Sequence, residues 1–183
     1  MSRIDAAYRR RLQAVWDELG IEADVVSARR LPLHPEARSL TPAGLGSDGR
    51  DKLLTAAAAR AWFALRAAAE TDGVALLLVS AFRSVDFQAA LIRNKLAKGR
   101  AIAEILTVNA PPGCSEHHTG RAVDLGVAGC PPLEEEFETT PAFAWLAEHA
   151  GRYGFVMSYP RGNAEGYLYE PWHWCWRPQR ERR

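Results

Sequence analysis

The sequence predicts an α+β fold, because helical and strand-like segments follow one another without regular alternation. Two long segments carry helical signals, at residues 3–19 and 52–70. Short apolar segments typical of strands lie at 74–80, 121–127, 154–159 and 172–176. A doubly wound α/β sheet would need strands and helices in strict alternation, which this order lacks.

In the first part of the chain, two helices are predicted on either side of a loop. Residues 3–19 carry apolar side chains at steps of three or four, and Gly20 ends the pattern. Residues 31–50 contain several prolines and glycines and are expected to form a loop. An alanine-rich helix should follow over 52–70. The apolar run at 74–80 predicts a strand that is buried on both faces.

The later helices are predicted mainly from their end signals. Ser84 is expected to cap a helix over 85–97, and a short helix should follow at 100–106. A further helix is expected over 141–150, with Pro141 at its first position, where proline costs no hydrogen bond.

Composition bounds the class of protein. The chain has 183 residues, 48% hydrophobic and 25% charged, which is enough for one domain with a real core. The formal net charge of +1 argues against an extensive surface for nucleic acid or another polyanion. Arginines cluster near both ends of the chain and are expected to be solvated.

Cysteine usage and apolar runs bear on the compartment. Cys114, Cys130 and Cys175 cannot all pair within one chain, so a reducing environment is expected. No secretory signal follows Met1, and no stretch approaches the ~18–20 apolar residues of a membrane span. We therefore expect a cytoplasmic protein without an integral membrane segment, or one of the cell envelope if the start is truncated or export is non-standard.

Two segments bring together side chains that can bind a metal ion. His117 and Asp124 are separated by Gly120, which suits one ligand on a turn and one on the strand that leaves it. Alternation along that strand puts Asp124 on the face opposite Val123 and Leu125. Imidazole and carboxylate are ligands that suit zinc, and three protein ligands with an open position are typical of a catalytic site.

The second segment contributes His173 and a spare carboxylate. Strand alternation puts Trp172, Trp174 and Trp176 on one face and His173 on the other. Glu170 lies three positions before His173, where a straight strand would turn it away from the metal. A bend at Pro171 is needed to bring it back, as a general base requires.

Structural roles are open for each of these residues. Spacing alone fits a metal centre or a set of ordinary buried polar groups for His117, Asp124 and His173. His34 and His149 are expected to be structural, and His118 to be structural or to support a ligand. The structural alternatives are a surface salt bridge for Arg83, a helix cap for Ser84, an exposed helix face for Gln88 and a turn hydroxyl for Ser115.

Several motifs in order carry a resemblance to a known family. S-x-H-x-x-G-x-A-x-D at 115–124, followed by E-x-W-H at 170–173, resembles the zinc D-alanyl-D-alanine carboxypeptidases of the VanY type. That group also includes lysostaphin-like endopeptidases and the hedgehog signalling domain. S-A-F-R-S-x-x-x-Q at 80–88 resembles a further family motif, and the similarity runs from about Leu33 to Trp176.

The resemblance implies a fold and a domain plan. The fold would be a small antiparallel central sheet flanked by helices, of the hedgehog/DD-peptidase type. A single zinc peptidase domain would occupy 1–183, with the helix and loop of 1–30 packed on the body. The family-like core would be 31–176, and 177–183 would be a basic tail.

The resemblance also implies roles for individual residues. One zinc ion would be held by His117, Asp124 and His173, and Glu170 would activate zinc-bound water as general base and acid. Arg83 would bind and polarise the substrate, while the peptide terminus would be held with the help of Ser84, Gln88 and Ser115. The expected reaction removes a C-terminal D-alanine from peptidoglycan stem peptides or precursors. Cys175 departs from the arginine that relatives often carry, which bears on substrate preference.

Three alternatives remain beside this expectation. An endolysin-type endopeptidase would cut peptidoglycan peptides internally. A non-catalytic zinc module would bind peptide or cell wall without turnover. A cysteine hydrolase would use Cys114 with His118.

Overall fold

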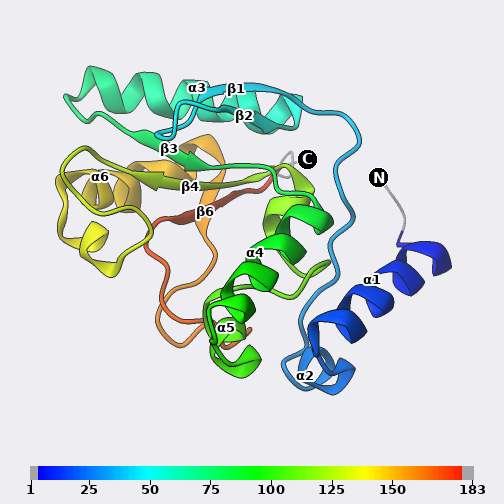
Figure 1. Ribbon diagram of the computed structural model, residues 1–183. Helices are drawn as coiled ribbons and strands as arrows, with labels where there is room; N and C mark the ends of the chain where they lie inside the picture. Colours follow the sequence, from blue (N-terminus) through cyan, green and yellow to red (C-terminus); the bar gives the residue numbers. More distant parts are fainter. Residues whose placement is uncertain (1–3, 179–183) are drawn as a thin grey trace.

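The computed structural model describes residues 4–178, and its centre is a four-stranded antiparallel sheet of order β3-β4-β6-β5. The strands are β3 (Leu77–Ser80), β4 (Ala122–Gly126), β5 (Phe155–Met157) and β6 (His173–Trp176). Helices lie on both sides of this sheet, with α3 on one side and α4 and α5 on the other (Figure 1). The predicted α+β class and small antiparallel sheet are confirmed.

The first hydrophobic core lies between the sheet and two helices. It joins α3 (Ala56–Thr71) and α6 (Pro141–His149) to the sheet face that carries Val123, Leu125 and Trp174. Trp172 and Trp176 are partly buried and pack against the same core. The predicted alternation is confirmed, so the indoles hold one face of β6 in the core and turn His173 to the other.

A second hydrophobic core lies on the other side, among α1 (Ala6–Leu19), α2 (Ala23–Ala28), α4 (Val85–Ala97) and α5 (Ile102–Val108). Trp16 of α1 is part of it and donates from Nε1 to the carbonyl of Pro112 at 2.8 Å. The N-terminal helices are therefore joined to the segment that leads into the 3₁₀ turn η1 (Glu116–Thr119).

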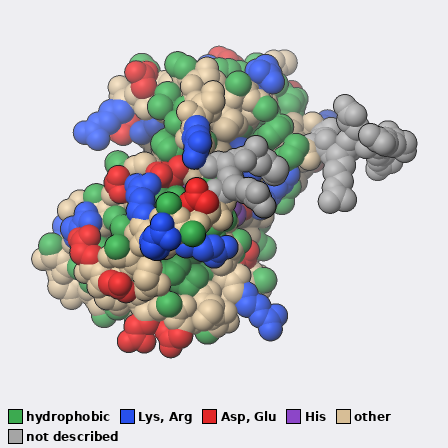
Figure 2. All heavy atoms as spheres, turned by 90° about the vertical axis from the view of Figure 1, so that its right-hand side faces the viewer, with side chains coloured by type: hydrophobic (Ala, Val, Ile, Leu, Met, Phe, Trp, Pro, Cys, Tyr) green, Lys and Arg blue, Asp and Glu red, His purple; other side chains and the backbone are tan. Residues whose placement is uncertain are grey.

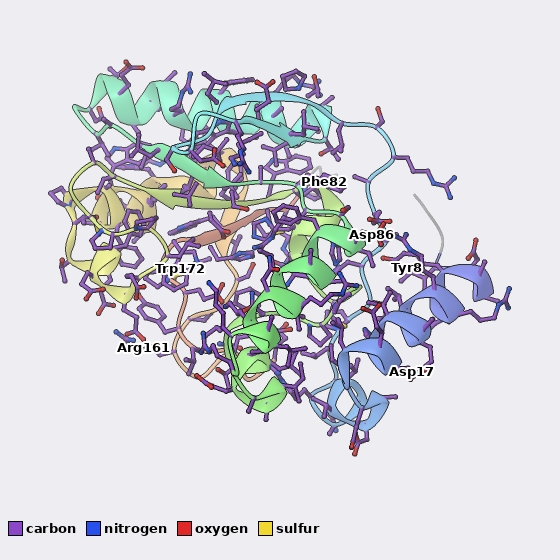
Figure 3. The ribbon with its side chains drawn as sticks, in the orientation of Figure 1. Tyr8, Asp17, Phe82, Asp86, Arg161 and Trp172 are labelled. Carbon is purple, nitrogen blue, oxygen red and sulfur yellow. The ribbon has the colours of Figure 1, made fainter. Side chains whose placement is uncertain are left out.

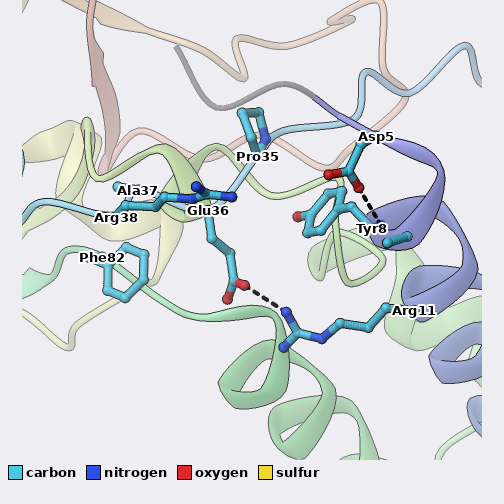
Figure 4. Close-up of a pocket in the computed structure, with 9 residues that line it drawn as sticks. Asp5, Tyr8, Arg11, Pro35, Glu36, Ala37, Arg38 and Phe82 are labelled. Carbon is cyan, nitrogen blue, oxygen red and sulfur yellow. Dashed lines mark hydrogen bonds and ion pairs between the residues drawn. The ribbon is translucent and has the colours of Figure 1, made fainter.

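Contacts at the start of α4 also bind it to the N-terminal part. Arg11 of α1 pairs with Glu36 and Asp86, and Glu36 accepts a hydrogen bond from the backbone N–H of Val85 at 2.6 Å. Figure 3 shows Phe82 where β3 leads into α4, and Asp86 on the first turn of that helix. Arg11 and Glu36 line a pocket of about 400 Å³ and point toward one another there (Figure 4).

Two predicted helix starts are confirmed. Ser84 at the start of α4 accepts a hydrogen bond from the N–H of Phe87 at 3.0 Å, and α6 begins at Pro141, capped by Thr140. The first helix begins at Ala6, later than the predicted residue 3, and Asp5 caps it. Two short 3₁₀ segments, η2 (Glu135–Thr139) and η3 (Ala150–Tyr153), flank α6.

The region from 31 to 54 differs from the prediction. Instead of a continuous loop and an early helix start, β1 (Thr41–Leu45) and β2 (Asp51–Leu54) form an antiparallel hairpin, and α3 begins only at Ala56. Gly44 and Gly49 have positive φ angles of 97° and 72°, so these glycines serve an irregular strand and its turn. The short helix α2 was not predicted either.

The strand β3 is less buried than its sequence predicts. Leu78 is buried, but Leu77 and Val79 are only partly so, because β3 is an edge strand of the sheet. Its neighbour β4 is buried along its whole length. The apolar run was therefore misinterpreted as a central strand.

Charges on the surface are mixed in sign. On the face drawn in Figure 2, acidic and basic side chains are interspersed rather than gathered by sign. Of the helices described, none combines the length and the apolar character needed to cross a membrane.

Candidate metal centre

Three buried side chains from two strands and a turn converge beneath the sheet. The register of β4 and β6 places Asp124 directly opposite His173. His117 comes from η1, which ends at Gly120 with φ 63°, a left-handed conformation that glycine adopts at little cost. The turn and strand predicted from the sequence therefore bring these two segments together.

The potential ligand atoms are close enough to share one ion. One such atom from each of His117, Asp124 and His173 lies within 4.8 Å of the others. His117 Nε2 is 3.2 Å from Asp124 Oδ1, and His173 Nδ1 is 3.0 Å from the same oxygen. All three residues are buried, at 0%, 3% and 2% exposure. Two imidazole nitrogens and one carboxylate form a donor set that fits zinc.

The other nitrogen of each imidazole is held by the protein. His117 Nδ1 donates to the carbonyl of Ala81 at 2.5 Å, and His173 Nε2 lies 3.0 Å from Glu116 Oε2. Metal-ligating histidines usually have such a partner, which fixes the ring and its tautomer. Both rings are thus oriented with one nitrogen free for a cation.

The electrostatics of the centre favour a bound cation. Burial opposes ionisation of Asp124, yet His117 and His173 outweigh it and hold the pKa of Asp124 well below its usual range. Burial also disfavours a charged His173, but its hydrogen bonds to Asp124 and Glu116 raise its pKa to about 10. The pKa of His117 falls to about 4, chiefly through burial. Two ionised carboxylates thus enclose a site where a metal ion can replace a proton.

Glu170 lies beside the three candidate ligands because the chain bends before β6. The N–H of His173 donates to the carbonyl of Glu170 at 3.1 Å, which closes a turn through Pro171. Glu170 Oε2 is consequently 3.9 Å from His173 Nδ1. Burial raises the pKa of Glu170 to about 7, which is suitable for an acid/base group at neutral pH. The bend that the sequence required is present.

Arg83 reaches the same centre from the segment between β3 and α4. Its Nη2 is 4.0 Å from Asp124 Oδ2, and its buried Nε has no hydrogen-bond partner within residues 4–178. Its backbone is held on both sides, because its N–H donates to the carbonyl of His117 and its carbonyl accepts from His118 Nδ1 at 2.6 Å. The guanidinium is therefore anchored at the centre and has donors to spare.

His118 supports this arrangement and is not placed to act as a base. Its Nδ1 is bound to Arg83, and its Nε2 accepts from the N–H of Gly113 at 3.0 Å. Burial raises the pKa of Cys114 to about 12, which keeps its thiol protonated. The geometry offers no support for a Cys114–His118 nucleophile.

A small inner pocket next to the centre collects unpaired polar atoms. It has a volume of about 20 Å³ and is lined by Gln88, Ser115 and Tyr167, together with Arg83 and Glu170. Gln88 Oε1 and Tyr167 Oη are buried and unpaired within the described part of the chain, like Arg83 Nε. Such groups are costly to bury without a partner, so the pocket suits a small polar ligand.

The other sequence-predicted residues are placed as follows. Gln88 is buried, not exposed, and its Nε2 donates to the carbonyl of Ala110 at 2.9 Å. Ser115 Oγ accepts from the N–H of His117 at 3.3 Å. Ser84 caps α4 and lines neither the inner pocket nor the outer cleft, so the structure does not bring it to the centre.

An outer cleft of about 350 Å³ leads to the centre. Asp124, Glu170 and Trp172 line it near the three ligands, and Lys95 and Leu168 line it elsewhere. Its volume is sufficient for several atoms of an extended peptide. The centre thus combines an open cleft with a small inner pocket.

Sequence reasoning missed Glu116, which lies next to His117 in the chain. Its carboxylate accepts from Ser158 Oγ at 2.5 Å and from Arg177 Nη2 at 2.6 Å, besides its contact with His173. Burial works against ionisation of Glu116, yet His173 and Ser158 hold its pKa far below the usual range. The signal in the sequence that could have indicated Glu116 was an acidic residue directly before a candidate ligand. Cys175 lies nearby, and burial raises the pKa of its thiol to about 12.

Two aromatic residues near the centre were also not singled out. Tyr159 lies against the ring of His173, with centroids 4.7 Å apart, and Tyr167 meets Tyr159 edge-on at 4.9 Å. Both tyrosines line the inner pocket. The signal in the sequence that could have indicated them was the presence of these tyrosines in the otherwise polar loop between β5 and β6.

Comparison with known proteins identifies relatives of this chain. The sequence model of the VanY family, described as D-alanyl-D-alanine carboxypeptidase, matches residues 51–179. A putative carboxypeptidase YodJ of Bacillus subtilis is 37% identical over 110 residues, covering 58% of this chain and 40% of the relative. A D-alanyl-D-alanine carboxypeptidase of Enterococcus faecalis is 34% identical over 117 residues, covering 58% of this chain and 42% of the relative. The chain thus spans well under half the length of these curated relatives.

Solved structures agree with these relatives. The LdcB LD-carboxypeptidase is similar with a TM-score of 0.69 and 30% identity, over 79% of this chain and 71% of that one. VanYB in complex with D-alanine-D-alanine is similar with a TM-score of 0.61 and 29% identity, over 80% of this chain and 82% of that one. A VanY D,D-pentapeptidase mutant in complex with Zn(II) has a TM-score of 0.59 and 27% identity, over 81% of this chain and 88% of that one.

Proposed function

Because this chain belongs to the VanY D-alanyl-D-alanine carboxypeptidase family, we propose that it is a zinc carboxypeptidase that removes a C-terminal D-alanine from peptidoglycan stem peptides or precursors. The observation that carries this proposal is the buried group of His117, Asp124 and His173, with Glu170 beside it at the end of an open cleft. The Zn(II) and D-alanine-D-alanine complexes of similar proteins support the metal and the substrate class.

His117, Asp124 and His173 would hold one zinc ion. Zinc, when bound, supplies a Lewis acid that polarises the peptide carbonyl and favours ionisation of water. Glu170 takes a proton from the attacking water at Oε2 and delivers it to the nitrogen of the leaving D-alanine. Its pKa of about 7 allows both transfers near neutral pH.

Arg83 and the inner pocket would bind the terminal residue. The guanidinium lines both the cleft and the inner pocket, has an unpaired Nε, and can hold either the terminal carboxylate or a developing oxyanion. Gln88 and Tyr167 offer further unpaired atoms in a space that accommodates only a small residue. The inner pocket of about 20 Å³ leaves little room for residues beyond the terminal one, which favours a carboxypeptidase over an endopeptidase. We extend the proposal to a single peptidase domain over 1–183, since both cores meet at this centre.

Mass spectrometry of synthetic stem peptides would test the proposal. The zinc-loaded protein should shorten a pentapeptide stem, or a tetrapeptide stem, by one D-alanine. The Glu170→Ala variant should bind zinc but show no turnover, whereas Glu70→Ala, at an exposed position of α3, should leave turnover intact. Unchanged peptides under varied conditions, or full activity of Glu170→Ala, would contradict the proposal.

The same set of peptides should also test cleavage between an L-residue and D-alanine. The LD-carboxypeptidase LdcB is among the similar structures, so a tetrapeptide whose last bond joins an L-residue to D-alanine should be tested beside the D,D-pentapeptide. Loss of D-alanine from only one of the two peptides would assign the stereochemical preference. Release of internal fragments from whole sacculi would instead indicate an endopeptidase, and tight zinc binding without turnover a non-catalytic module.

A further inference from the structure

The outer cleft contains a cation that no carboxylate neutralises. Lys95, near the end of α4, lines the cleft together with Arg83 and Arg100. The hydrogen-bond partner of its Nζ is the neutral Asn109 Oδ1, at 2.5 Å. No carboxylate lies within ion-pair distance of Nζ among residues 4–178. An ammonium group in this position lacks the counter-charge that a partly buried cation normally has.

Other basic side chains of the molecule show what Lys95 lacks. Its neighbour on the same helix, Arg93, pairs with Glu18 at 2.7 Å, and Arg100 pairs with Glu104 at 2.6 Å. Further pairs with carboxylates involve Arg11, Lys52, Arg161 and Arg177. Lys95 differs from these residues in having a neutral partner.

Two cations lie close enough to act on Lys95. Its burial, followed by the charges of Arg100 and Arg83, lowers the pKa of its ammonium group, against smaller opposing effects of Glu104 and Glu170. Such a site gains from an anion that enters with the ligand, because the anion then interacts with more than one cation. Glu134 and Glu135 line the same cleft from the segment before α6, so a carboxylate is drawn to the α4 side.

Lys95 and Arg83 hold different places along the cleft. Arg83 Nη2 is 4.0 Å from Asp124 Oδ2, and Arg83 lines both the inner pocket and the outer cleft, whereas Lys95 lines only the outer cleft of these two. A ligand whose terminal residue occupies the inner pocket beside Arg83 would extend its upstream residues into the outer cleft. A second anionic group on one of those residues would then meet Lys95.

We propose that Lys95, with Arg100 beside it, forms a subsite for a second carboxylate of the peptide substrate, carried by a residue upstream of the terminal one. This inference rests on the proposed function for the direction in which the peptide lies. The expected ligand is a peptide that carries an ionised side-chain carboxylate. The same peptide with a carboxamide in place of that carboxylate should bind more weakly. The subsite would act on binding, because Lys95 does not contact the metal ligands.

Matched peptides that end in D-alanine test this subsite. Each pair would differ only in glutamate or glutamine at one upstream position. At one of the upstream positions tested, the wild-type KM should be about tenfold lower for the glutamate peptide than for the glutamine peptide. This ratio is the size expected for the loss of one partly exposed charge-assisted hydrogen bond. The value of kcat should be similar for both, and added salt should reduce the difference.

Variants of α4 assign the preference to Lys95. Lys95→Met should lose the difference between acid and amide and leave the amide peptide's KM unchanged, while Lys95→Arg should retain the difference. The matched control is Arg93→Met, which removes an exposed cation from the same helix. An equal KM for acid and amide at every upstream position in the wild type would overturn the proposal, as would a preference that survives in Lys95→Met. An equal effect of Lys95→Met on acid and amide peptides would assign Lys95 to the terminal carboxylate instead.

A binding measurement separates this inference from the proposed function. Calorimetry with the zinc-loaded Glu170→Ala protein compares the affinity of the same acid and amide peptides without turnover. Tighter binding of the acid, abolished by Lys95→Met, would support the subsite even if no peptide were cleaved. Cleavage without discrimination in either assay would leave the carboxypeptidase in place and remove the subsite.

Discussion

Replacing Glu116 with alanine removes an acceptor that three donors share. His173 Nε2, Ser158 Oγ and Arg177 Nη2 all lie within 3.0 Å of its carboxylate. Of these, the His173 contact matters most to the metal, because it leaves Nδ1 of the same ring facing Asp124. With the acceptor gone, the ring loses the partner that fixes its tautomer, and its buried N–H is left unpaired.

The expected magnitude follows from that contact. Loss of such an outer partner weakens metal binding by about 10- to 100-fold, or roughly 1.4–2.8 kcal/mol. Glu116→Ala should lie at the upper end, because His173 is 2% exposed and water cannot easily replace the carboxylate. Glu116→Gln should lie at the lower end, because its amide oxygen can still accept from His173. Its amide nitrogen would face Arg177, whose side chain is 54% exposed and can turn away.

The assay is competition for zinc against a chromophoric chelator, with thermal unfolding of the zinc-loaded protein as a check on folding. Arg177→Met provides a matched control, since it removes only the exposed partner and should change the zinc Kd by less than Glu116→Ala. A zinc Kd for Glu116→Ala within twofold of the wild-type value, roughly 0.4 kcal/mol, would refute the reasoning. Equal effects of Arg177→Met and Glu116→Ala would refute the assignment of the loss to His173.

Further predictions address the metal, the core and the N-terminal contacts. Chelation should abolish D-alanine release, and added zinc should restore it. Activity that persists in chelator would exclude a metal peptidase. Cys114→Ala should leave the rate of D-alanine release unchanged. Trp174→Ala should cost about 3–5 kcal/mol of unfolding free energy, measured in urea, because it empties the core behind β6. Glu36→Ala should cost about 1 kcal/mol, because the Val85 N–H loses its acceptor; Asp17→Ala, on the exposed side of α1, should cost much less.

Local sequence signals predicted most elements well because their causes are local. The starts of α4 and α6 each depend on one capping side chain directly before the helix. The alternation in β6 likewise follows from a period of two along a strand. The hairpin of β1 and β2 escaped prediction because its pairing partner is what makes Pro42 and Gly44 part of a strand. The edge position of β3 is also a property of the whole sheet, so a run of apolar residues in the sequence does not reveal it.

The candidate site divides in the same way. Motif spacing indicated His117, Asp124, His173 and Glu170, since residue type and backbone period limit which side chains can share a face. Glu116 was not predicted, because its role depends on hydrogen-bond partners that lie 42 to 61 positions away in the chain. The missing counter-charge of Lys95 is likewise visible only when its neighbours are known.

The sequence by itself determined the starts of α4 and α6, the face of β6 that carries His173, and the resemblance to a zinc peptidase family. Each of these depends on residue identity and on spacings short enough for the backbone to transmit. Only the tertiary structure decided that Pro171 bends Glu170 toward His173 and that Asp124 pairs with that histidine. It also decided that Lys95 shares a cleft with Arg83. These relations join segments far apart in the chain, and packing of the two cores fixes the distances between them.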